Sequence, residues 1–132
     1  MDDWHAVYDV LVRYAAAVDR HDWDAVGACF ATNARAIYAG DEIGPGREAI
    51  VSVLRDALTA SASTHLVGGV SIQVEGNRAT SQQTAVAFRV EGSRLVIRGL
   101  RYDDRLEQRD GHWEITRRVH TPIWTAEGAT VV

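Results

Sequence analysis

The sequence contains no lysine, and all 14 basic residues among its 132 are arginine. The absence of lysine excludes Schiff-base chemistry, a pyridoxal-phosphate anchor and the lysine of a P-loop. A single cysteine, Cys29, excludes a disulfide framework within the chain and a cysteine-based zinc site. Exclusive use of arginine is typical of a GC-rich genome, so an arginine at a given position does not by itself indicate function.

Positive charge is also scarce, because 18 acidic residues give a net charge of −4. A nucleic-acid partner needs a basic face, so this balance argues against one. The first residues are acidic, whereas a signal peptide begins with positive charge and an apolar segment. The longest uncharged stretch, Ala57 to Val74, is interrupted by polar residues and glycines, so we expect no membrane span. These features predict a cytoplasmic protein that binds neither nucleic acid nor membranes.

The first part of the chain is predicted to be mainly helical. A first helix from about Asp2 to Asp19 has apolar residues at steps of three and four. A second short helix has Asp22 as its N-cap, a buried side that includes Phe30, and an end at Asn33. A strand, Ala34–Ala39, a Gly-Pro-Gly turn and a third helix, Arg47–Leu58, are expected to follow. The apolar stripe of the first helix consists of Trp4, Val7, Leu11, Tyr14 and Val18.

After Thr64 the pattern is that of an antiparallel meander. Four long strands are separated by short turns containing glycine, at roughly hairpin spacing. Strands of this length make a strongly curled sheet. We predict a single α+β domain, 1–132, in which a cone-shaped antiparallel sheet is covered by the N-terminal helices and encloses a pocket. The four strands are His65–Val74, Arg78–Val90, Arg94–Arg109 and His112–Trp124.

Asp19 is an unusual residue for the end of a helix. A carboxylate there is disfavoured by the helix dipole, and aspartate is a poor helix former. Asp19 could cap the following loop or pair with an arginine. Alternatively, it points into the pocket and orients a histidine. Of the five histidines, His5, His21 and His112 are expected at the surface, which leaves His65 and His120 as the candidates for such a partner.

Strand alternation groups further polar residues. Arg118 and His120 share one face of the last strand, and Tyr102 and Asp104 share one face of the strand before it. Alternation alone does not decide whether that face borders the pocket or solvent. The opposite face of the last strand is predicted to hold Trp113, Ile115, Arg117 and Val119.

Four segments together resemble the SnoaL-like branch of the nuclear transport factor 2 superfamily. They occur in the order typical of that branch and span nearly the whole chain. The resemblance implies a cone-shaped α+β barrel, in agreement with the prediction from the residues. The segments are Tyr14–Ala25, Gly46–Ile50, Thr64–Val67 and Tyr102–Arg118.

The resemblance also implies a set of site residues. Scytalone dehydratase, a bile-acid 7α-dehydratase and γ-hexachlorocyclohexane dehydrochlorinase use an aspartate at the end of the first helix and a histidine at the start of the first long strand, here Asp19 and His65. The last two add an arginine on the last strand, here Arg118, and the bile-acid enzyme a tyrosine, here Tyr14. The second catalytic histidine of scytalone dehydratase has no counterpart on the next strand, Ser81–Ala87.

The predicted function is that of a cofactor-free lyase or isomerase, similar to dehydratases and polyketide cyclases. His65 would abstract a proton from carbon, Asp19 would orient it, and Arg118 would stabilise the developing negative charge. Tyr14 would hydrogen-bond a substrate oxygen. No metal is required, since no cluster of histidine and glutamate has ligand spacing. The substrate would be a small hydrophobic or polycyclic organic molecule, contacted by Tyr38, Tyr102, His120 and Trp124.

Two alternatives stay open. The chain could be a non-catalytic small-ligand binding or accessory protein, in which Asp19 and His65 merely satisfy each other. An epoxide hydrolase would require Asp104 to lie beside Arg118, and it is the less favoured alternative. Open edge strands and the apolar tail Pro122–Trp124 predict a homo-oligomer, a dimer or trimer, although the tail could instead close the pocket.

Overall fold

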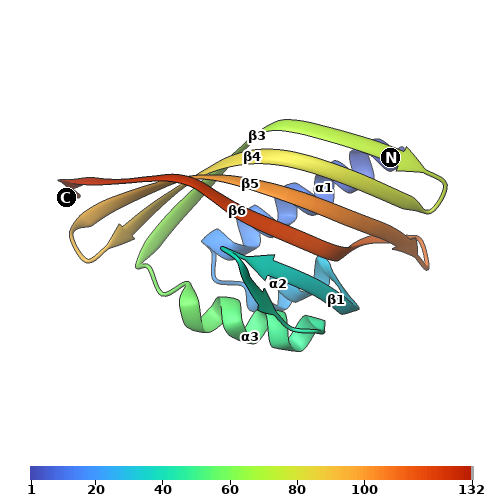
Figure 1. The fold of residues 1–132 in the computed structure, drawn as a ribbon, viewed down its shortest axis with the longest axis horizontal. Helices are drawn as coiled ribbons and strands as arrows, with labels where there is room; N and C mark the ends of the chain where they lie inside the picture. The colour runs from blue at the N-terminus through green and yellow to red at the C-terminus, as the bar shows by residue number, and fades with distance from the viewer. Residues whose placement is uncertain (132) are drawn as a thin grey trace.

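The computed structural model describes residues 1–131, and the chain folds into helices followed by one long sheet (Figure 1). No helix within these residues is long and apolar enough to cross a bilayer. The helices are α1 (Asp3–Asp19), α2 (Trp23–Ala28) and α3 (Arg47–Ala57). The strands are β1 (Phe30–Tyr38), β2 (Asp41–Ile43), β3 (Ala62–Glu75), β4 (Arg78–Glu91), β5 (Arg94–Arg109) and β6 (His112–Thr130).

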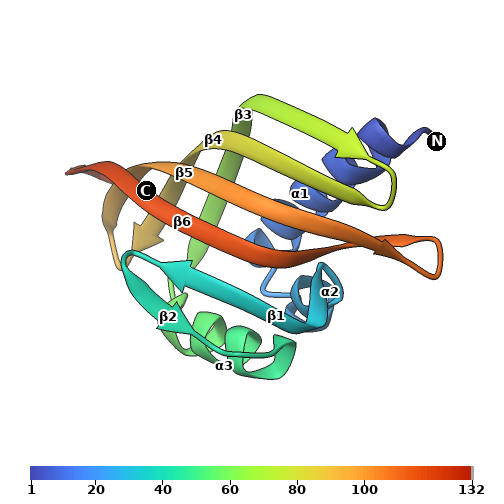
Figure 2. The ribbon, with the colours of Figure 1, turned by 45° about the vertical axis from the view of Figure 1, so that its right-hand side comes forward.

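The strands form one six-stranded sheet in the order β2-β1-β6-β5-β4-β3 (Figure 2). Strands β3 to β6 form the predicted antiparallel meander. The sheet as a whole is mixed, because β1 returns from the helices to pair with β6 in parallel. Across the described residues β2 and β3 are the two ends of the order, so the sheet is curled but not closed. The predicted α+β class, with helices packed over a curled sheet, is confirmed.

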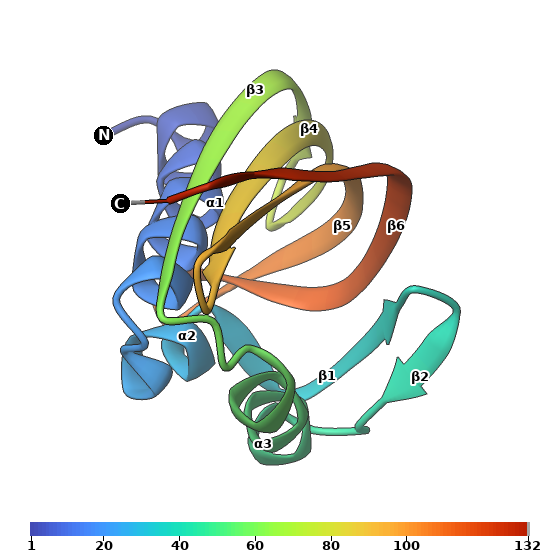
Figure 3. The ribbon, with the colours of Figure 1, turned by 90° about the vertical axis from the view of Figure 1, so that its left-hand side faces the viewer.

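The helices lie on the concave side of the sheet (Figure 3). Helix α1 begins where the side chain of its N-cap, Asp2, accepts a 2.9 Å hydrogen bond from the His5 backbone N–H. The predicted apolar stripe of α1 is buried except at Trp4, which is 41% exposed. Helix α1 packs against β3, and α3 packs against β1. The core therefore lies between the helices and the inner face of the sheet, and it includes Leu11 and Phe30, both fully buried.

Two local predictions fail between α2 and α3. Helix α2 ends at Ala28, and Phe30 begins β1 opposite Ile115 of β6 instead of lying on the helix. The side chain of Phe30 would be buried either at the end of a helix or at the start of a strand, so periodicity over a few residues does not distinguish the two. The short strand β2, Asp41–Ile43, was not expected, and it pairs with the end of β1 as a hairpin.

A β-bulge in β6 reverses the predicted alternation. Arg117 pairs with Arg105, whereas Ile115 pairs with the next residue of β5, so Thr116 is an extra residue in β6. As a result Ile115 and Arg118 both point inward and are fully buried, while Arg117 is exposed on the outer face. The predicted grouping of Ile115 with Arg117 on one face is therefore wrong.

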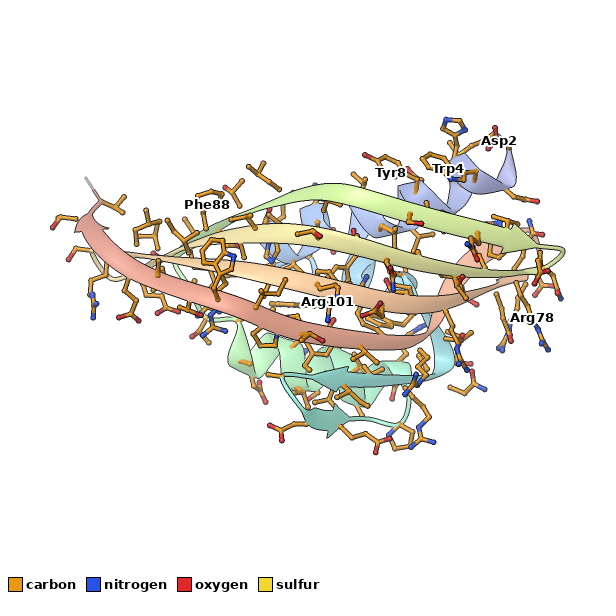
Figure 4. The ribbon with its side chains drawn as sticks, turned by 45° about the horizontal axis from the view of Figure 1, so that its top comes forward. Asp2, Trp4, Tyr8, Arg78, Phe88 and Arg101 are labelled. Atoms are coloured by element: carbon orange, nitrogen blue, oxygen red, sulfur yellow. The ribbon has the colours of Figure 1, made fainter. Side chains whose placement is uncertain are left out.

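Trp124 lies on the outer face of the sheet, away from the helices. It pairs with Gly99 of β5, and a Cβ atom placed on Gly99 would be 2.3 Å from the Trp124 Nε1 atom. The indole ring thus rests directly on the glycine backbone, and about half of its surface is exposed. Figure 4 looks onto this outer face, where Phe88 and Arg101 are also seen.

We expect Gly99→Ala to displace the Trp124 ring and to lower the free energy of unfolding by about 1–3 kcal/mol, because the added methyl overlaps the ring. The matched control is Gly128→Ala in β6, where an added Cβ meets nothing within 4 Å. Urea unfolding monitored by tryptophan fluorescence would measure both. Equal stability of the two variants would contradict the close packing of Trp124 on Gly99.

Candidate active site

A cavity of about 360 Å³ lies between the inner face of the sheet and the helices. Helix α3 lines it with apolar side chains, whereas each of the six strands contributes at least one polar side chain. A mostly apolar hollow of this size with a few convergent polar groups suits a small organic ligand. Residues lining it include Val18, Ile43, Leu54, Leu58, Ser63, His65, Ala87, Leu100, Tyr102 and His120.

Asp19 and His65 are in direct contact beside this cavity. The His65 Nδ1 atom lies 2.6 Å from Asp19 Oδ1. The His65 backbone N–H donates to Asp19 Oδ2 at 2.7 Å, and the Ser63 hydroxyl donates to Oδ1 at 2.9 Å. The carboxylate at the unfavourable end of α1 is therefore compensated by three donors from β3. The His65 side chain is 9% exposed and lines the cavity, with Asp19 behind it.

Arg118 forms a buried ion pair with Asp104. Its Nε and Nη2 atoms donate to the two carboxylate oxygens of Asp104, both at 2.8 Å, and neither side chain has any exposed surface. The rings of Tyr14 and Tyr102 stack on the guanidinium, with centroids 4.3 and 4.1 Å from its Cζ atom. Burial acts to lower the pKa of Arg118, but the carboxylate of Asp104 more than offsets this, and the net pKa is raised.

Two tyrosine hydroxyls lie at the cavity wall. The hydroxyl oxygens of Tyr14 and Tyr38 are 2.6 Å apart. Burial raises the pKa of both phenols, so both stay protonated near neutral pH. One O–H is used in the hydrogen bond between them, which leaves the other free to donate to an oxygen atom in the cavity.

His120 borders the same cavity from β6. Its ring stacks on Tyr38, with a centroid distance of 4.7 Å, and lies 5.4 Å from Tyr102. The His120 Nδ1 atom is buried and has no hydrogen-bond partner within residues 1–131. Burial, followed by the positive charge of Arg118, lowers the pKa of His120 from 6.5 to about 4. The imidazole is therefore neutral at physiological pH.

The structure places five of the eight predicted site residues on the wall of one cavity. Asp19 lies just behind this wall, in contact with His65, and two others lie apart from it. Arg118 does not line the cavity, because Tyr14 and Tyr102 cover it and Asp104 occupies its fork. Trp124 lies on the opposite face of the sheet. The residues that do line the cavity are Tyr14, Tyr38, His65, Tyr102 and His120.

Asp104 lies inward beside Arg118, as the epoxide hydrolase alternative requires. However, Arg118 engages both of its carboxylate oxygens, and the pair has no exposed surface. Neither group lines the cavity, so this pair has no position from which to activate a water molecule there. The geometry does not support that alternative.

Several residues of the cavity wall were not predicted. One of them is Arg98 of β5, which lies four residues before Tyr102. Residues an even number of positions apart on a strand share a face, so alternation would have placed both on the same side. Ser63 precedes the predicted strand His65–Val74, but it lies within β3 and its hydroxyl donates to Asp19. Among residues 1–131 no group of three or more histidine, cysteine, aspartate or glutamate side chains is arranged to hold a metal ion.

The sequence profile of the SnoaL-like domain family matches residues 1–119. The chain belongs to the SnoaL-like family. A search of curated proteins finds no match.

Three solved structures illustrate the similarity of fold. One, from Novosphingobium aromaticivorans, has the provisional name scytalone dehydratase; it is 19% identical, with a TM-score of 0.87, over 97% of this chain and 89% of its own. A hexachlorocyclohexane dehydrochlorinase from Novosphingobium barchaimii is 16% identical, with a TM-score of 0.86, over 97% and 92%. A nuclear transport factor 2-like protein with a cystatin-like fold, also from N. aromaticivorans, is 20% identical, with a TM-score of 0.76, over 92% and 82%.

The buried ion pair yields a stability prediction. Asp104→Leu or Arg118→Met alone should lower the free energy of unfolding by about 3–5 kcal/mol, because each leaves an uncompensated buried charge. The double variant should recover most of that loss, because it removes both charges. Urea denaturation of all four proteins would complete a double-mutant cycle. Additive losses would contradict direct coupling between the two groups.

His120 yields a pH prediction. Its pKa is about 4 in the folded protein and near 6.5 when unfolded, so between these values the unfolded chain binds more protons. Its contribution should therefore lower stability as the pH falls from 6.5 to 4. We expect His120→Asn to be less sensitive to pH than the wild type in this window, with the exposed His112→Asn as control. Melting temperatures from pH 7 to pH 4 would measure this, and parallel curves for all three proteins would contradict it.

Proposed function

We propose that the protein is a cofactor-free lyase or isomerase that acts on a small organic molecule by abstracting a proton from carbon. The observation that carries this proposal is the Asp19–His65 contact at the wall of an otherwise largely apolar cavity. A neutral imidazole whose Nδ1–H is held by a carboxylate presents Nε2 as a base. The dehydrochlorinase and the dehydratase named above share the fold, and their names describe eliminations, which supports this reaction class.

The elimination would balance as follows for a hydroxyl leaving group. His65 Nε2 takes the proton from the carbon, and the electrons of the C–H bond form the new double bond. The C–O bond breaks as the tyrosine O–H of the Tyr14–Tyr38 pair donates a hydrogen bond to the departing oxygen. The His65 imidazolium then returns the proton to that oxygen, which releases water. Isomerisation would use the same first step and return the proton to a different carbon.

Arg118 takes a different role in this proposal from the one first expected. Because it is sealed behind Tyr14 and Tyr102, we infer that it positions these two rings and does not contact the substrate. Its charge still influences the cavity, since it helps to keep the neighbouring His120 neutral. His120 would then offer a neutral ring, stacked on Tyr38, as a wall for an unsaturated substrate.

A second candidate function is non-catalytic binding of a small ligand. It is favoured by the number of bonds that Asp19 makes: the carboxylate also accepts from Ser63 and from the His65 backbone, and it thereby fastens α1 to β3. The fold would need the Asp19 carboxylate for this contact even if His65 transferred no proton. The two functions differ in whether His65 exchanges protons with a bound carbon acid.

Proton abstraction is measurable before the natural substrate is known. Incubation with a panel of cyclic ketones and β-hydroxy ketones in D₂O should produce deuterium at the acidic carbon, observed by NMR, and loss of water where a hydroxyl is present. His65→Ala should slow the exchange by about 10²–10⁴-fold, the usual contribution of a general base. The control is His112→Ala, since His112 lies at the exposed β5–β6 hairpin.

Asp19→Asn tests orientation separately from base strength. As Asp19 lies behind His65, its loss should reduce kcat and leave KM within about threefold, since the substrate does not touch it. A purely structural role would instead reduce thermal stability without this separation of kcat from KM. Exchange that is unaffected by His65→Ala would support the non-catalytic function.

A further inference from the structure

The cavity contains an arginine to which no role has been assigned. Arg98 of β5 is half-buried and lines the cavity wall. Within residues 1–131 no carboxylate lies within 4.0 Å of its guanidinium, and its Nε atom is buried without a hydrogen-bond partner. A partly buried guanidinium with unused donors is costly, and it is the group that proteins use to bind carboxylates.

The nearby acidic residues are engaged elsewhere or lie apart. Glu91 at the end of β4 pairs with Arg89, the other arginine of the cavity wall. Glu127 of β6 accepts a 2.8 Å hydrogen bond from Arg94. Asp41 lines the cavity from β2, but β1 and β6 separate its strand from β5. This end of the cavity is therefore positively charged.

Strand register places Arg98 in line with the proposed base. His65 of β3 pairs with Ala87 of β4, and Ala87 pairs with Arg98 of β5, so the three form one cross-strand row on the inner face. Neighbouring strands are about 4.8 Å apart, which separates His65 from Arg98 by about 10 Å across the sheet. The residue between them has only a methyl side chain. A ligand thus has room to lie over Ala87 with one end at each of the other two.

We propose that the substrate of this site is an organic carboxylate, bound with its anionic group on Arg98 and its apolar body over Ala87, so that its acidic C–H lies at His65. This proposal rests on the function proposed above and names its substrate class. The carboxylate and the reacting carbon would lie at opposite ends of one ring system. Arg89 adds a second positive charge to the cavity wall, and its Nη2 atom donates to Glu91, whereas its Nε atom is buried without a partner among the described residues, like that of Arg98.

The test uses a pair of probes that differ in charge and hardly in shape, 2-naphthoate and 2-naphthamide. Isothermal titration of the wild type should show at least tenfold tighter binding of the carboxylate, as expected of a charge-assisted bidentate contact. In Arg98→Gln the preference should disappear, and Arg98→Lys should be intermediate, since it keeps the charge without the fork. Circular dichroism would verify that each variant is folded.

The matched control is Arg101→Gln. Arg101 lies on the same strand but is exposed on the outer face (Figure 4), so the same change of charge there should keep the preference. The proposal is overturned if the wild type binds the two probes equally or binds neither, or if Arg98→Gln and Arg98→Lys both keep the wild-type preference.

The outcome for Arg98 is distinguishable from the outcome for catalysis. Binding of 2-naphthoate requires no proton transfer, so His65→Ala and Asp19→Asn should keep the preference for the carboxylate. If His65→Ala leaves proton exchange unchanged while the preference depends on Arg98, the cavity binds carboxylates without catalysis by His65. If exchange depends on His65 but the preference does not depend on Arg98, only the inferred substrate class fails.

Discussion

The site depends on one carboxylate, that of Asp19, which joins the end of α1 to the beginning of β3. Three donors from β3 converge on it, and two of them come from His65 itself. The same contacts that offset the unfavourable helix dipole therefore also fix the orientation of the imidazole. Because β3 is an edge strand of the sheet, these hydrogen bonds also hold that edge against α1. The contacts that pack α1 against β3 are consequently the same contacts that place the proposed base.

Much of the architecture could be predicted from the residues alone. The apolar period of α1 and the glycine-containing turns between long strands were sufficient for the α+β class and the meander. The parallel pairing of β1 with β6 was not predictable, because it joins segments about 80 residues apart and depends on tertiary packing. The bulge at Thr116 was missed for a related reason. An extra residue in a strand leaves no mark in composition, yet it moves every later side chain to the opposite face.

Some site residues could likewise be predicted from the sequence, and others could not. Asp19 was singled out as a carboxylate at the unfavourable end of a helix, and Tyr14 by the family resemblance. The structure places both beside the cavity. Arg118 was expected at the substrate, but its position along the chain gave no information on depth, and the structure buries it against the rings of Tyr14 and Tyr102. Arg98 was overlooked in a chain where every cation is an arginine, although its period of two matches that of Tyr102.

The small side chain of Ala87 has a consequence for how such a cavity could diverge. The separation between an anchoring charge and the base is set by the spacing of strands, so it changes only in steps of about 4.8 Å as the charge moves from one strand to the next. The spacing of the strands thus fixes the possible distances between the anchoring charge and the base. Moving the arginine one strand inward, to the position of Ala87, would select a shorter molecule. With the base left where it is, the length of the selected molecule would follow from the strand that carries the arginine.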